Sequence, residues 1–61
     1  MRGSLFTDFF KNGKKKIEGV LIKGKRSGLW TGWYSNGGTK FTGNYRNGTK
    51  DGKWVEWDIN K

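Results

Sequence analysis

The chain has 61 residues, of which 13 are Lys or Arg and 5 are Asp or Glu, so its formal net charge is +8; it contains no His, Cys or Pro. These numbers exclude zinc fingers, disulfide frameworks, cysteine nucleophiles and serine–histidine triads, and they allow one small domain or a piece of a repeat array. No apolar stretch approaches the ~20 residues of a membrane span, and the first residues lack the apolar region of a signal peptide. We therefore expect a basic, cytoplasmic module that binds a partner.

Residues 1–4, Met-Arg-Gly-Ser, are typical of an expression-vector leader or a disordered start, and we assign the folded domain to residues 5–61. Only 31% of the residues are hydrophobic, but four Trp, two Tyr and four Phe can supply a thin core. A chain of this size without a disulfide or a metal often depends on a partner or on self-association for stability.

In chain order, five strands are predicted at residues 5–10, 15–22, 29–35, 39–46 and 53–59. The first, third and fifth are rich in aromatic residues, whereas the second and fourth alternate between apolar or glycine residues and polar ones, as half-buried strands do. The absence of Ala and the frequent Gly disfavour a helix anywhere. The sequence therefore predicts an all-β antiparallel meander of five strands.

Turns are predicted between these strands. Asn-Gly pairs at 12–13, 36–37 and 47–48 predict tight hairpin turns of type I′, because both central positions of such a turn need a positive φ. The segments 23–27 and 47–51 are predicted to be basic loops that precede the third and fifth strands.

Two glycines, Gly19 and Gly43, fall in the middle of predicted strands, where Gly costs stability. Their bare backbone would allow the close approach of a large ring, and Trp30 and Trp54 are the candidates for it. A second Trp follows each of these after three residues. Either both faces of the strand carry an aromatic ring, or a bulge rotates one of them.

The chain also matches itself at an offset of 24 residues, which predicts an internal repeat. The register gives a half repeat over residues 5–13 and full repeats over 14–37 and 38–61. Arg26 and Lys50 are a conservative pair in this register. The identical pairs include Lys16 and Lys40, Gly19 and Gly43, Gly24 and Gly48, Gly28 and Gly52, Trp30 and Trp54, and Trp33 and Trp57.

With the repeat aligned, the segment Phe41-x-Gly43-x-Tyr45-x-x-Gly48-x-x-x-Gly52-x-Trp54 resembles the MORN repeat (membrane occupation and recognition nexus), most closely the bacterial variant of antitoxin components. Residues 17–30 have the same frame, with aliphatic residues in two of the aromatic positions. The resemblance implies successive β-hairpins in an elongated, twisted sheet. It implies no catalytic activity, because MORN repeats are associated with protein contacts, dimerisation and acidic lipids.

Nothing in the sequence favours an enzyme. The carboxylates are scattered along the chain, and a small sheet has little room for the paired carboxylates of a hydrolase; they are Asp8, Glu18, Asp51, Glu56 and Asp58. The Gly-rich segment 23–28 lacks the Gly-Lys-Ser/Thr ending and the following helix of a phosphate-binding P-loop. We expect no catalytic residues, no cofactor, no metal and no small-molecule substrate.

The candidate site residues form three groups. The structural group is Gly19, Gly43, Trp30 and Trp54, and the expected core adds Phe6, Phe41 and Tyr45. Aromatic residues expected at the surface are the candidates for partner binding, namely Phe9, Phe10, Trp33, Tyr34 and Trp57. A basic patch is expected at two successive loops, which a meander places at opposite ends of the sheet, and it comprises Lys14, Lys15, Lys16, Lys23, Lys25 and Arg26.

Two functions remain open at this stage. The first is a non-catalytic module that binds protein or itself, as a homo-oligomer formed by strand addition at an outer strand. The alternative is a binder of polyanions, either nucleic acid or an acidic phospholipid surface, through the basic loops and exposed aromatics. A flat apolar edge would favour the first function, and cations gathered on one face would favour the second.

Overall fold

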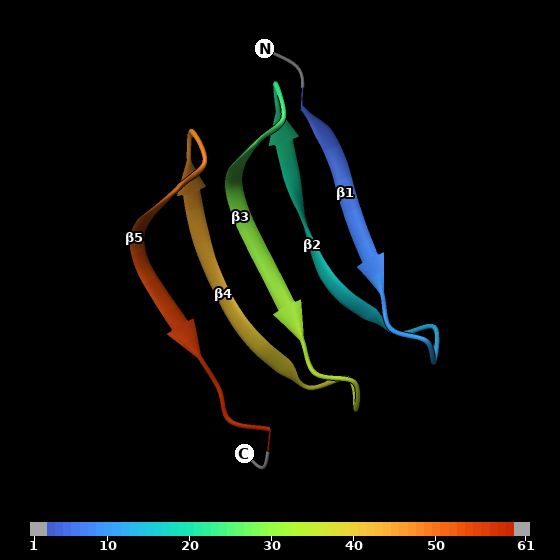
Figure 1. The fold of residues 1–61 in the computed structure, drawn as a ribbon. Coiled ribbons are helices and arrows are strands. Elements are labelled where there is room, and N and C mark those ends of the chain that lie inside the picture. The colour runs from blue at the N-terminus through green and yellow to red at the C-terminus, as the bar shows by residue number, and fades with distance from the viewer. Residues whose placement is uncertain (1–2, 60–61) are drawn as a thin grey trace.

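The computed structural model describes residues 3–59, which form five antiparallel strands in one sheet (Figure 1). The strands are neighbours in chain order, which confirms the predicted all-β meander, and they are β1 (Ser4–Phe9), β2 (Lys15–Ile22), β3 (Lys25–Trp33), β4 (Thr39–Arg46) and β5 (Thr49–Glu56). Within the described residues, no helix is long and apolar enough to cross a membrane.

The described residues include only part of the predicted domain boundaries. Ser4, which the sequence suggested to be the end of a leader, is the first residue of β1 and pairs with Leu21. Residues 1–2 of the predicted leader and residues 60–61 of the second predicted repeat lie outside the described residues.

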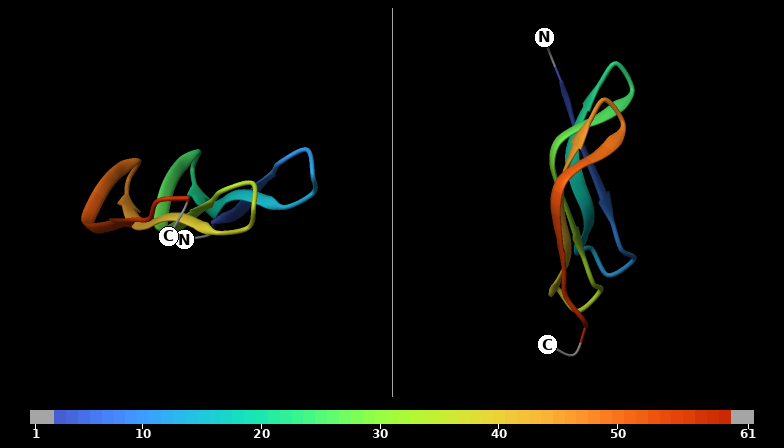
Figure 2. Two further views of the ribbon diagram at one scale, coloured as in Figure 1. Left: turned by 90° about the horizontal axis from the view of Figure 1, so that it is seen from below. Right: turned by 90° about the vertical axis from the view of Figure 1, so that its left-hand side faces the viewer.

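The sheet is a single layer, and the edge-on views in Figure 2 show the strands curving and twisting together. Its principal extents are 37 × 25 × 11 Å. The smallest of these is close to the ~10 Å that separates two packed sheets, so it leaves room for one sheet and its own side chains only. The core of this protein must therefore consist of side chains that lie down on the backbone.

Two-residue turns at 23–24 and 47–48 connect the strands at one end of the sheet. All four turn residues have a positive φ, between 52° and 87°, which is the signature of type I′ turns. The predicted turn at 47–48 is confirmed. The predicted basic loops 23–27 and 47–51 were wrong, because the chain reverses in two residues, and β3 and β5 begin at Lys25 and Thr49.

At the other end, the turns over 10–14 and 34–38 are longer. In the first of these, the Phe10 N–H donates to the Lys14 carbonyl at 2.8 Å, and Gly13 has a φ of 88°. Asn12 is not among the residues with positive φ, so the type I′ prediction for 12–13 was wrong, and the same holds for 36–37. The Asn side chain instead caps the turn, since Asn12 Oδ1 accepts from the Lys14 N–H at 2.9 Å.

Two tryptophans lie flat on two glycines and form the centre of the core. A Cβ atom on Gly19 would overlap the indole of Trp30, and one on Gly43 would overlap the indole of Trp54. The Trp30 Nε1–H donates to the Val20 carbonyl at 3.2 Å, and the Trp54 indole makes the equivalent bond across its own strand pair. The predicted approach of Trp rings to bare backbone is confirmed, and Trp30, 1% exposed, is the most deeply buried large side chain described.

Irregular pairing brings each Trp over its glycine. Between the pairs Glu18–Thr31 and Val20–Ser27, Gly19 alone faces three residues of β3 that end at Trp30. The same irregularity places Gly43 opposite three residues of β5. Such bulges bend and twist the strand, and the two Trp–Gly contacts, 24 residues apart, have matching surroundings. The repeat over the whole chain stays a prediction.

The second tryptophan of β3 lies on the opposite face. Trp30, Thr31, Gly32 and Trp33 pair in succession with β4, and the irregularity there falls on the β4 side. Alternation along β3 therefore turns Trp33 away from the face that carries Trp30. Of the two arrangements left open by the sequence, the one with rings on both faces is correct for this strand.

One residue assigned to the core lies at the surface. Phe6 is 39% exposed, although its ring centroid lies 6.0 Å from that of Trp30. The physical reason is its position on β1, which has a neighbour on one side only. The other expected core residues, Phe41, Tyr45 and Trp54, are half-buried.

The first prediction concerns the Trp–Gly contacts. We expect Gly19→Ala and Gly43→Ala each to lower the free energy of unfolding by about 1–3 kcal/mol, because the new methyl group must displace an indole that fills the core. Urea unfolding followed by Trp fluorescence measures this difference.

Gly38→Ala is the matched control. Gly38 has an ordinary φ, and a Cβ there would lie 3.2 Å from Asn36 Oδ1, which accepts from the Gly38 N–H and would need to shift by only a few tenths of an ångström. We expect the control to change the unfolding free energy by less than about 0.5 kcal/mol. Equal effects of Gly19→Ala and Gly38→Ala would contradict the packing account.

Candidate functional site

One face of the sheet carries a row of rings, and we call it the ring face. Its five rings come from four strands and contact one another in sequence: Phe6, Trp30, Tyr45, Trp54 and Phe41. The centroid separations along this row are 6.0, 6.0, 5.1 and 5.6 Å. The two contacts of Tyr45 are edge-to-face, a favoured geometry worth about 0.5–1.5 kcal/mol each beyond burial. The row ties β1 to β5 across the whole sheet.

Cations lie over these rings at the end of the sheet that carries the two-residue turns. The Arg26 guanidinium carbon is 4.8 Å from the Trp30 ring centroid and 5.3 Å from that of Tyr45, and Arg26 Nη1 donates to Tyr45 Oη at 3.0 Å. Lys50 Nζ lies 4.7 Å from the Trp54 ring centroid. Attraction between a cation and the face of a ring is strongest for Trp, so both charges are held in place.

A second pair of cations lies near the opposite end of the strands. Lys16 Nζ is 5.8 Å from the Phe10 ring centroid, and Lys40 Nζ is 5.9 Å from that of Tyr34. Both lysines are the extra residue of a bulge, since the pairing passes over Lys16 in β2 and over Lys40 in β4. They line a hollow of about 330 Å³ together with Ile17 and Phe41, which pair with Gly32 from its two sides and so lie on the ring face.

The carboxylates leave these four cations without an ionic partner. Within residues 3–59 the one ion pair is Lys15 to Glu18, at 3.0 Å. Glu18 pairs with Thr31 and also accepts from Thr7 Oγ1, so it lies on the face opposite the rings. Hydrogen bonds from Lys15 and then from Thr7 hold the pKa of Glu18 below its ordinary value.

The predicted basic patch is divided between the two ends of the sheet. Lys14, Lys15 and Lys16 lie at the turn over 10–14, whereas the other three members lie at the turn over 23–24, at the opposite end in Figure 1. Three of the six lie over rings: Lys16 and Arg26 are among the four cations described above, and Lys15 Nζ is 5.9 Å from the ring centroid of Trp33 on the opposite face.

We call the four cations on the ring-face side the ring-held cations, namely Lys16, Arg26, Lys40 and Lys50. Sequence reasoning missed two of them. Lys40 and Lys50 were not proposed as site residues, although Lys40 follows Lys16 by 24 residues and Lys50 follows Arg26 by the same interval. Adding 24 to the number of each basic residue of the predicted patch identifies both lysines.

The aromatic residues predicted to bind a partner gather at one end of the sheet, because β1, β3 and β5 run in the same direction. Phe10, Trp33 and Tyr34 line the same hollow and are half-buried. Phe9 and Trp57 are exposed, as expected. The prediction that all five are surface residues therefore holds fully for two of them.

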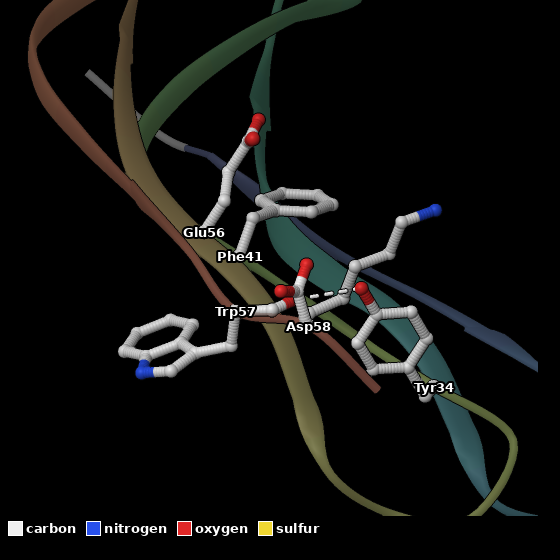
Figure 3. A pocket seen from close by; sticks show the side chains of 6 residues that line it. Tyr34, Phe41, Glu56, Trp57 and Asp58 are labelled. Atoms are coloured by element: carbon white, nitrogen blue, oxygen red, sulfur yellow. Dashed lines mark hydrogen bonds between the residues drawn. The ribbon is translucent and has the colours of Figure 1, made fainter. Parts of the chain in front are cut away.

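A second hollow, of about 540 Å³, adjoins the first and is lined by Tyr34, Lys40, Phe41, Glu56, Trp57 and Asp58. Figure 3 shows Tyr34 reaching across it, and its hydroxyl donates to the Trp57 carbonyl at 2.6 Å. This bond joins the segment that follows β5 to Tyr34, the residue directly after β3. The Trp57 ring points away from the hollow, toward solvent.

Exposed apolar side chains concentrate at the two edges of the sheet. Of the exposed large hydrophobic residues described, all but Leu29 belong to β1, to β5 or to the segment after β5, and they are Leu5, Phe6, Phe9, Val55, Trp57 and Ile59. In the described residues, no group of His, Cys, Asp or Glu side chains could hold a metal ion. The arrangement is suited to contact: an apolar edge and a cationic face.

The single ion pair generates a prediction about pH. Because the pKa of Glu18 is lowered in the folded chain, the unfolded chain takes up the proton first as the pH falls. The stabilisation is therefore complete above the ordinary value of 4.5 and is lost as the pH falls through the folded-state pKa. We expect Glu18→Gln to cause a small loss of stability at neutral pH that disappears in acid.

Chemical unfolding at a series of pH values measures this. The control is Glu56→Gln, since Glu56 has no ion pair within the described residues, and its effect should not follow the same pH profile. A Glu18→Gln effect that stays constant from neutral to acid pH would contradict the assignment.

In comparisons with protein-family models, curated proteins and solved structures, the chain has no match. The resemblance to MORN repeats therefore rests on the spacing of glycines and aromatic residues in the sequence.

Proposed function

We propose that this chain is a non-catalytic, MORN-like module that binds protein, including a second copy of itself, by adding a strand to the free edge of β1. The observation that carries the proposal is the character of that edge. β1 is an outer strand, and its residues Leu5 and Phe9 are 71% and 55% exposed.

The composition of β1 supports this reading. Outer strands usually carry lysine, proline or a bend that blocks further pairing. The six residues of β1, Ser-Leu-Phe-Thr-Asp-Phe, contain neither Lys nor Pro, and Asp8 is their one charge. Although the chain has a net charge of +8, β1 carries no cation, so two copies can bring their β1 strands together with little electrostatic repulsion between these strands.

The other edge is less suited to strand addition. β5 carries two lysines and two carboxylates, Lys50, Lys53, Asp51 and Glu56, and its pairing with β4 is irregular around Gly52, which has a φ of 69°. Charge and bending are two devices by which proteins block an edge. The proposal therefore places the binding edge at β1.

The thin core gives a physical reason for association. A single-layer sheet buries little apolar surface, and adding a strand to β1 would cover Leu5, Phe6 and Phe9 from a second side. Main-chain hydrogen bonds would supply affinity, and the exposed side chains of β1 would supply specificity. The association of MORN repeats with protein contacts and dimerisation supports the same proposal.

Sedimentation over a range of protein concentrations tests the proposal. We expect a concentration-dependent dimer that Leu5→Lys weakens by about tenfold to 100-fold, because the apolar contact of a leucine is lost and a cation is added at the edge. Leu29→Lys is the matched control, since Leu29 is 60% exposed but lies on the central strand β3.

Two results would count against the proposal. If the chain remains monomeric at high micromolar concentration, self-association is excluded. Equal weakening by Leu5→Lys and Leu29→Lys would show that association does not use the β1 edge.

A further inference from the structure

We propose that the ring face binds the phosphate backbone of nucleic acid through the four ring-held cations, Lys16, Arg26, Lys40 and Lys50, by charge and without stacking of bases. This inference is independent of strand addition at β1. It rests on the positions of the four cations, on the contacts that hold them, and on the absence of open indole faces for stacking with bases.

The four cations are positioned before any ligand arrives. Each lies 4.7–5.9 Å from a ring centroid, and Arg26 is additionally fixed by its bond to Tyr45 Oη. All four residues are exposed, and none is paired with a carboxylate within residues 3–59. A held, unpaired and solvent-accessible cation loses little entropy when it meets a phosphate.

The charges are spread across the ring face. Arg26 and Lys50 lie on β3 and β5, and Lys16 and Lys40 lie on β2 and β4, so the members of each pair are two strands, or about 10 Å, apart. Lys16 and Leu21, the partner of Arg26, are five residues apart on β2, which separates the two pairs by about 17 Å. A flexible polyanion can contact all four, whereas a single phosphate cannot.

The two indoles of the ring face are not available for stacking with bases. Trp30 is buried, with Gly19 beneath its indole and Arg26 above it. Lys50 covers Trp54 in the same way, with Gly43 beneath that indole. Proteins that bind single strands by stacking present open ring faces. Here each indole holds a cation over its outer face, which predicts that the affinity for nucleic acid does not depend on base identity.

The distribution of apolar groups favours nucleic acid over a membrane surface. A protein that binds an acidic membrane places cations beside apolar side chains that project into the headgroup region. The indoles of Trp30 and Trp54, beneath Arg26 and Lys50, lie flat on glycines and do not project. Of the exposed apolar side chains, Trp57 and Ile59 line hollows beside Lys40. Contact with phosphates needs no such projection.

Fluorescence anisotropy with labelled oligothymidylate and oligoadenylate of about 12 nucleotides tests the proposal. Four phosphate contacts predict that affinity for a single strand falls about 50-fold between about 50 and 200 mM salt. For Arg26→Gln with Lys50→Gln, two contacts remain, and the fall should be about 7-fold. Thermal unfolding of each variant checks that the fold is kept.

The matched control is Lys11→Gln with Lys23→Gln. It removes the same two charges from exposed turn lysines that lie over no ring within the described residues, and its salt dependence should match that of the unchanged chain. If Arg26→Gln with Lys50→Gln unfolds the chain, Lys16→Gln with Lys40→Gln provides the same comparison at the other pair.

Three outcomes would overturn the inference. Equal effects of the ring-held and control substitutions would show attraction by net charge alone. Tighter binding of oligoadenylate than of oligothymidylate would show that bases stack. Stronger binding to vesicles of phosphatidylcholine and phosphatidylserine than to either oligonucleotide would assign the face to a membrane surface.

Discussion

The contact of an indole with a bare glycine backbone is the constraint on which this structure depends. A single-layer sheet has no second layer to cover its apolar residues, so it can form a core only if large side chains lie down on the strands. Trp30 does so over Gly19, and a side chain at position 19 would prevent it. The same requirement explains why both strand glycines are tolerated despite their cost in a β-sheet.

The charge pattern of the ring face follows from the same packing. An indole that lies on glycine shows its other face to solvent, and a cation over that face shields apolar surface while its own charge stays hydrated. Arg26 and Lys50 take these places over Trp30 and Trp54. Part of the net charge of +8 thus covers rings that no second layer covers, and the proposed binding of a polyanion uses the same charges.

The sequence was sufficient for the number and order of the strands and for the Trp–Gly contacts, because alternation and strand glycines are local signals, but the predicted strands 29–35 and 53–59 begin four residues later than β3 and β5. It was insufficient for features that depend on how neighbouring strands pair. The turn at 23–24 lacks an Asn, so its sequence does not distinguish a two-residue turn from a longer loop. The bulges at Lys16 and Lys40 depend on strand register, which no local signal fixes. Phe6 is more exposed than predicted, because β1 is an outer strand of the predicted meander and no described residue covers its ring from the free side.

The two proposed surfaces are compatible because they use different directions of the same sheet. Strand addition at β1 uses backbone groups in the plane of the sheet, whereas the four cations project perpendicular to it. If two copies pair antiparallel through β1, the two-fold axis stands perpendicular to the sheet, and both ring faces lie on the same side. A continuous anionic chain could then contact both copies, and the second contact would be intramolecular. Self-association would in that case raise the affinity for a polyanion without any new contact, which links the apolar edge of β1 to the cationic face.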